Sequence, residues 1–182
     1  HIDQLRNTFI NIFNILKPNG IFIFEVGYFK SVLENGSFDT TYHEHLDYHH
    51  ALPLSKFLQK IGFEIIDFST NNIQGGSLRV HLSKKSNAKI SLKANTFLLN
   101  ESKSILYQEE FLKTFSTNIK FITQQFGERI KKYSNEGNLI IGYGVPTKST
   151  LLLAMSNLSL KEINCMLEDN KLKVGRFLPS SC

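Results

Sequence analysis

One short apolar run does most to limit the folds open to this 182-residue chain. Residues 21–26 follow a Lys-Pro-Asn-Gly turn and show no alternation of apolar and polar side chains before Glu25. Such a run is typical of a strand buried on both faces of a parallel sheet, which predicts an α/β fold. Ligands of these folds bind at the carboxyl ends of the strands, where Glu25 and Tyr28 are placed. A carboxylate that caps the next helix is the alternative for Glu25.

Periodicity and turn residues predict the elements around this strand. Apolar residues at helical spacing predict helices, and two apolar segments with a short connection predict an antiparallel strand pair. The long helix over 105–133 has one apolar stripe and is expected to be structural. The predicted helices are 2–16, 28–33, 53–61 and 105–133, and the predicted strand pair is 63–68 with 77–82.

The last part of the chain predicts the beginning of a βαβ unit. Residues 139–144 form a strand that ends in a glycine turn, 146–155 a helix, and 164–167 a second strand. The amino end of such a helix suits an anion such as phosphate, and Lys148 adds a cation there. A P-loop is the alternative, but Thr147 stands where its second glycine is required.

Residues 38–50 concentrate the groups able to move protons, including four of the six histidines. Removing a proton next to a carbonyl needs a base of near-neutral pKa and a hydrogen-bond donor for the enolate oxygen, and His45 with Tyr42 and Glu44 offers that set. A metal-dependent hydrolase is one alternative, because His43, His45 and Asp47 nearly complete a metal-binding HxHxDH run. Mutual hydrogen bonding of ordinary loop residues is the other.

Composition excludes several other classes. No apolar run approaches the length of a membrane span and no leader is present, so we expect a cytoplasmic protein that does not contact a membrane. The net charge of +5 comes from scattered lysines, which argues against nucleic-acid binding. The two cysteines form no CxxC pair, which leaves no basis for a zinc site.

The start at His1 and the ending at Cys182 both suggest truncation of a longer protein.

Three segments together resemble a known family. They are 38–48 (FDTTYHEHLDY), 74–80 (QGGSLRV) and 142–148 (GYGVPTK). In this order and spacing the chain is similar to the S-adenosylmethionine-dependent C-methyltransferases of deoxysugar biosynthesis, which act on nucleotide-linked 4-keto sugars. The first segment is the specific one, whereas glycine turns alone are common.

The resemblance implies a fold and a domain division. Residues 1–90 would be the C-terminal part of a Rossmann-like methyltransferase domain, with its last parallel strand and a terminal antiparallel pair. Residues 91–136 would be a linking helical segment, and 137–182 the start of a second α/β domain that binds the nucleotide sugar. The glycine loop for S-adenosylmethionine and an N-terminal zinc-binding domain would precede this chain, which would be inactive alone.

The resemblance also implies roles for individual residues. His45 would abstract the proton, Tyr42 would contact the sugar, and Glu44 would hold a sugar hydroxyl or orient His45. The main cofactor ligands would lie outside the chain, with Glu25 and Tyr28 as the candidates within it. The implied substrate-binding residues are His1, His43, Tyr143, Lys148 and Arg176.

Three positions depart from the family pattern. Gly27 replaces a proline and Ser149 a glycine, changes that alter turn stiffness more than chemistry. Gln74 replaces a histidine and cannot titrate, so the substrate could be another keto sugar or another carbonyl compound. A piece that binds a sugar nucleotide without catalysis is the alternative from a different class.

Overall fold

The chain divides into two compact units. The computed structural model describes residues 2–84 and 91–179, and the fold is mixed α/β. The first unit is formed by His1–Ser37 and Glu44–Leu112, and the second by Phe38–His43 and Lys113–Cys182. Among the described residues, no helix has the length and apolar character needed to cross a bilayer.

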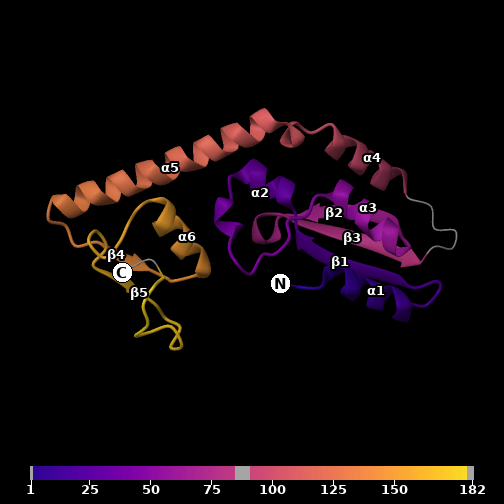
Figure 1. Cartoon of the computed structure of the whole chain (residues 1–182), viewed down its shortest axis with the longest axis horizontal. Coiled ribbons are helices and arrows are strands. Elements are labelled where there is room, and N and C mark those ends of the chain that lie inside the picture. Colours follow the sequence, from indigo (N-terminus) through magenta and orange to yellow (C-terminus); the bar gives the residue numbers. More distant parts are fainter. Residues whose placement is uncertain (1, 85–90, 180–182) are drawn as a thin grey trace. The chain divides into compact units, whose positions relative to one another are not determined.

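Helices and strands alternate along much of the chain (Figure 1). Three short 3₁₀ turns, Phe38–Thr40, Ile73–Gly75 and Ile105–Tyr107, connect some of them. In chain order the elements are α1 (Leu5–Ile15), β1 (Ile21–Gly27), α2 (Phe29–Asn35), α3 (Ala51–Ile61), β2 (Phe63–Asn71), β3 (Ser77–Lys84), α4 (Leu92–Ser102), α5 (Glu109–Asn135), β4 (Ile141–Tyr143), α6 (Thr147–Met155) and β5 (Cys165–Leu167).

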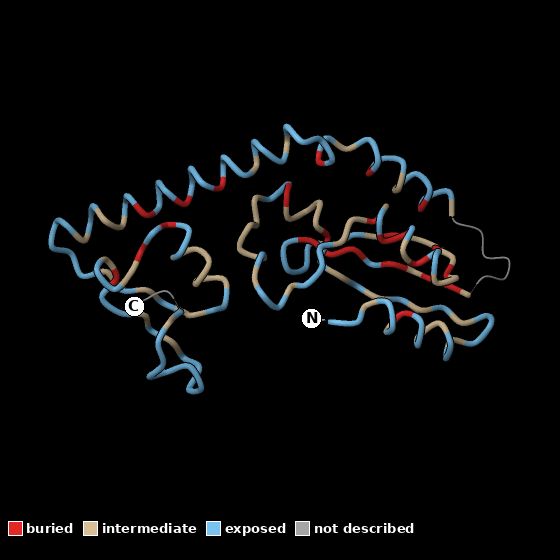
Figure 2. The backbone as a smooth tube through the Cα atoms, viewed as in Figure 1, coloured by how far each residue is buried: buried red, intermediate tan, exposed pale blue. Residues whose placement is uncertain are grey.

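Strand β3 is the centre of the sheet in the first unit. The strand order is β1-β3-β2, and β3 is antiparallel to both neighbours (Figure 1). Its inward side chains Leu78, Val80 and Leu82 are fully buried. Much of the tube along β3 is accordingly coloured as buried in Figure 2. The antiparallel pairing of the predicted strand pair is therefore confirmed.

The expectation that β1 is buried on both faces is wrong for the chain described here. Exposure alternates along the strand, with Phe22 and Phe24 packed against the core while Ile21 is 59% and Ile23 50% exposed. The core side of the sheet takes its cover from α1 and α3, through residues such as Phe9 and Leu58. The described residues give the opposite face of β1 much less cover, so its isoleucines remain exposed.

Phe9 of α1 holds an aromatic cluster together. Its ring lies edge-on to those of Phe22, Phe24, Phe57 and Phe63 at centroid distances between 5.1 and 6.3 Å. Such pairs contribute about 0.5–1.5 kcal/mol each beyond the area they bury. The helical spacing of apolar residues near the start of the chain thus serves to dock α1 on the sheet.

The predicted long helix begins later than expected. Residues 105–107 form a separate 3₁₀ turn, in which the Ser104 hydroxyl accepts a hydrogen bond from the Leu106 N–H at 3.3 Å. Gln108 then has extended backbone, with ψ at 133°, so α5 begins at Glu109. The apolar periodicity continues across this break, so the periodic pattern does not predict it.

The second unit contains the strand-helix-strand segment predicted from the sequence. Strands β4 and β5 pair in parallel, Ile141 opposite Cys165, and α6 connects them. Buried positions recur every four residues along α5, at Ile119, Thr123 and Gly127 (Figure 2). At Gly127 the helix comes so close to the backbone carbonyl of Ser156 that an added Cβ would overlap it.

Replacing Gly127 by alanine should therefore destabilise the second unit. Alanine gains about 1 kcal/mol of helix propensity over glycine. Overlap with a backbone atom, which cannot move as a flexible side chain can, costs about 1–3 kcal/mol. We expect a lower Tm for Gly127→Ala, measured by circular dichroism. Ser116→Ala, at an exposed position of the same helix, is the control and should leave the Tm unchanged or slightly higher. An unchanged Tm for Gly127→Ala would contradict the close packing.

Candidate active site

The histidine-rich segment is mainly an irregular loop between α2 and α3. After the 3₁₀ turn Phe38–Thr40, residues 41–48 adopt neither helix nor strand. The loop ends in a bridge between His49 and Tyr28, the residue that follows β1. The boundary between the compact units falls inside the motif, because His43 belongs to the second unit and Glu44 to the first.

In the first unit, the proposed base His45 lies in this loop and is half-buried. Its ring is edge-on to that of Tyr48, with the centroids 6.4 Å apart, and Tyr48 in turn packs on Phe29 at 5.1 Å. His45 therefore has an aromatic, partly solvated environment and is not packed into the apolar core. Glu44, next to it, is exposed.

In the second unit, the predicted ligands Tyr42 and His43 lie with their ring centroids 6.2 Å apart. Lys148, in the first turn of α6, forms an ion pair with Asp39 of the 3₁₀ turn, with 3.2 Å between Nζ and Oδ2. Both side chains are about 40% exposed, so the pair contributes at most about 1 kcal/mol. An anionic ligand could displace Asp39 from Lys148 at little energetic cost.

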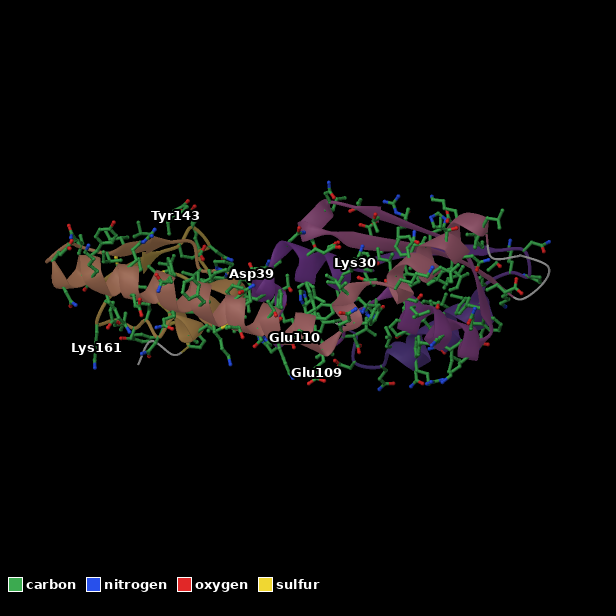
Figure 3. All side chains as sticks on the ribbon, turned by 90° about the horizontal axis from the view of Figure 1, so that it is seen from above. Lys30, Asp39, Glu109, Glu110, Tyr143 and Lys161 are labelled. Carbon is green, nitrogen blue, oxygen red and sulfur yellow. The ribbon has the colours of Figure 1, made fainter. Side chains whose placement is uncertain are left out.

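The glycine turn after β4 is lined by two carboxylates that follow β5. The Val145 N–H donates to Glu168 Oε2 at 2.9 Å, and the hydroxyl of Tyr143 donates to Asp169 Oδ2 at 2.6 Å. The backbone N–H groups of Asn170 and Val145 lower the pKa of Glu168. One donor of the predicted phosphate-binding turn is thus already bonded to a carboxylate. The Tyr143 side chain is 75% exposed and lies at the surface (Figure 3).

The remaining predicted substrate ligands are Arg176 and His1. Arg176 is exposed and directly follows a turn that comes after β5. His1 lies outside the described residues. Among the residues that the structure describes, no group of three or more histidine, cysteine or acidic side chains is arranged to hold a metal ion.

Glu25 and Tyr28, the candidate cofactor ligands, both have protein partners. Nε and a terminal nitrogen of Arg79 lie 3.0 Å from Glu25 Oε2, and hydrogen bonds from Asn71 and Arg79 lower the pKa of Glu25. Tyr28 is 4% exposed and donates to Glu101 at 2.6 Å. Burial first, and then this carboxylate, raise the pKa of Tyr28.

Glu101 is the polar residue that sequence reasoning missed. It is 3% exposed, and both of its oxygens accept hydrogen bonds, two from backbone N–H groups at the start of α3 and two from tyrosines. It lies near the end of α4, in a segment interpreted as a linker. Its partners are up to 73 residues away in the sequence, so no local pattern could have identified it.

Gln74 has a backbone conformation that is rare for its residue type. Its φ is 52° and ψ 34°, in the left-handed region, and Gly75 and Gly76 after it also have positive φ. The turn is held from α2, where Asn35 Nδ2 donates to the Gly75 carbonyl at 3.0 Å. Gly76 lies so close to Ser31 that an added Cβ would overlap that side chain.

Comparison with known proteins identifies the family. A family model described as the C-methyltransferase C-terminal domain matches residues 72–182, which is more than half of the chain. The chain therefore belongs to the C-methyltransferase family, and the resemblance drawn from its motifs is confirmed at this level. It is also 28% identical over all 182 residues to C-methyltransferase NovU of Streptomyces niveus. The alignment covers 43% of that protein, so the chain spans less than half of this relative's length.

Replacing Gln74 by glycine should stabilise the first unit. Glycine adopts positive φ without the steric penalty that a Cβ causes, and this penalty is about 1–2 kcal/mol. The extra freedom of glycine in the unfolded chain offsets part of it. We expect the free energy of unfolding in urea to rise by about 0.5–1 kcal/mol. Gln74→Ala keeps the Cβ and is the control, with no such gain. Equal stability of both variants would argue against strain at this residue.

The stability of the first unit should fall as the pH falls below neutral. Burial lowers the pKa values of His49 and His50 from their usual 6.5, although Asp47 and Glu101 respectively oppose the shift. The unfolded chain then binds these protons at a higher pH than the folded chain does. Stability is full above about pH 6.5 and is lost as the pH falls through the lowered values.

His50→Phe should therefore reduce the loss of Tm between pH 7 and pH 5. A phenyl ring fits among the rings of Tyr28, Phe29 and Tyr107, and His50 Nε2 is buried without a hydrogen-bond partner in the described chain. His43→Gln, which replaces an exposed histidine of the same segment, should leave the loss of Tm as it is. If His50→Phe has the pH dependence of the wild type, His50 does not contribute to it.

Proposed function

We propose that this chain is the part of a C-methyltransferase that supplies the catalytic base and part of the nucleotide-sugar site. The substrate would be a nucleotide-linked keto-deoxysugar, and S-adenosylmethionine would supply the methyl group as a sulfonium. The observation that carries the proposal is the half-buried His45 in the irregular loop between α2 and α3, in a chain of this family. That loop ends in a bridge to Tyr28, the residue after β1.

In the proposed reaction, His45 takes the proton from the carbon next to the ketone. The electron pair of that C–H bond would then delocalise into the enolate. S-adenosylmethionine, when bound, would supply the methyl group to this carbon, the methyl–sulfur bond breaking with its electron pair left on sulfur. The hydroxyl of Tyr42 would donate to the developing oxyanion or contact the sugar, and Glu44 would bind a sugar hydroxyl or orient the imidazole. General-base catalysis of this type is worth about 10²–10⁴ in rate.

The cofactor would be held mainly by residues outside this chain. The polar groups of Glu25 and Tyr28 are bonded to Arg79 and Glu101, respectively. Both residues are therefore already engaged in contacts within the protein. Within this chain, these two residues would contribute by shaping the carboxyl end of β1.

The nucleotide part of the substrate would bind to the second unit. An exchangeable cation at Lys148, the exposed phenol of Tyr143 and the guanidinium of Arg176 suit a diphosphate and its nucleoside. His43 and His1 would complete the sugar-facing side. We propose 1–90 as methyltransferase domain, 91–136 as linking helical segment and 137–182 as nucleotide-sugar domain.

His45→Asn in the intact protein should abolish most methyl transfer. Asparagine keeps a hydrogen-bonding side chain but cannot accept the proton, so we expect kcat to fall at least ~100-fold. Transfer of a radiolabelled methyl group to a nucleotide-linked 4-keto-deoxysugar is the measurement. His81→Asn, which removes an imidazole from the middle of β3, is the matched control and should retain activity. Full turnover by His45→Asn would remove the base assignment.

A further inference from the structure

Glu101 is a buried carboxylate without an ion-pair partner among the lysines and arginines that the structure describes. Its Oε1 accepts from the hydroxyl of Tyr28 at 2.6 Å and from the N–H of Ala51 at 2.9 Å. Its Oε2 accepts from the N–H of Leu52 at 2.5 Å and from the hydroxyl of Tyr107 at 2.9 Å. Four donors converge on one carboxylate, and together they replace the water that burial removes.

Two of these donors belong to the amino end of α3. Ala51 and Leu52 are its first two residues and follow His50, where the histidine-rich loop ends. In the described structure the His50 side chain caps neither N–H group. Glu101, from α4, therefore caps α3 from outside, and its negative charge is favourable at this end of the helix dipole.

The third donor to Glu101 is the hydroxyl of Tyr28, at the end of β1. Tyr28 follows this strand, and its backbone N–H donates to the Gly76 carbonyl at 3.0 Å. The next residue, Phe29, donates its N–H to the carbonyl of His49 at 3.0 Å. Glu101 thus joins the start of α3 to the residue that follows β1. The end of the loop is bonded to the same region through His49, and residues 49–52 follow His45 by four to seven positions.

We infer that Glu101 is a positioning residue for the loop that carries His45. The inference rests on the proposed function and goes beyond it, because Glu101 lies in α4, outside the histidine motif. By holding Ala51, Leu52 and Tyr28, the carboxylate limits where the preceding loop can lie. A displacement of a catalytic group by about 1 Å can cost on the order of 10²-fold in rate, so loosening this anchor should affect the chemical step.

The decisive variant is Glu101→Gln in the intact protein. Glutamine has the same shape but a single acceptor oxygen, and its NH₂ group would face an N–H or O–H donor. At a temperature well below the Tm of the variant, we expect kcat for methyl transfer to fall about 10–100-fold. The KM values for both substrates should change less than about threefold. Hydrogen exchange should become faster at Ala51, Leu52 and the preceding loop.

The matched control is Glu110→Gln, the same chemical change at an exposed residue of α5, which should keep kcat and exchange unchanged. If Glu101→Gln folds with normal kcat, Glu101 serves stability alone and the inference is wrong. If that variant does not fold, Tyr107→Phe, which removes one donor of the four, becomes the test and should lower kcat by a smaller factor. An unchanged kcat there would also overturn the inference.

Failure of the proposed function gives a different result. Wild-type protein would then transfer no methyl group, or His45→Asn would retain activity. Hydrogen exchange of residues 44–52 in Glu101→Gln still reports on the anchor in that case. Unchanged exchange would refute the positioning of the loop, whatever the reaction is.

Discussion

The backbone pairing of β3 on both of its sides is the constraint on which the first unit depends. A strand that bonds to a neighbour on each edge cannot slip by one residue without turning Leu78, Val80 and Leu82 out of the core. This register also fixes where the turn after β2 and the end of β1 lie. Those two segments hold Gln74 and Tyr28, so the position of the candidate site follows from the packing of the sheet.

Much of the fold could be predicted because it is encoded locally. Gly62 ends α3 with φ at 116°, and Pro53 lies in the first turn of that helix, as the turn chemistry indicated. The exposure of β1 could not be predicted in this way. An apolar run indicates that a strand can be buried on both faces. Whether both faces are buried depends on which distant segments of the chain pack against them. The break at Gln108 was missed because periodicity is insensitive to a single extended residue.

A candidate site could be predicted from the sequence only where residues able to transfer protons are concentrated. The histidine motif identified the loop, and the structure places His45 there in a half-buried position beside Tyr48. The partners of Lys148 and Tyr143 are carboxylates, and long-range contacts of this kind leave no periodic signal. Glu101 is the clearest case, since all four of its hydrogen-bond donors lie outside α4.

The segment Phe38–His43 belongs to the second unit, although the chain on both sides of it belongs to the first. The polypeptide therefore passes between the units three times: before Phe38, after His43, and between Leu112 and Lys113. No single cut separates them. A fragment beginning at Lys113 would lack Asp39, leaving Lys148 without its counter-ion, and one ending at Leu112 would retain six residues that pack elsewhere. A fragment that contains only one of the two units therefore divides the histidine motif between His43 and Glu44.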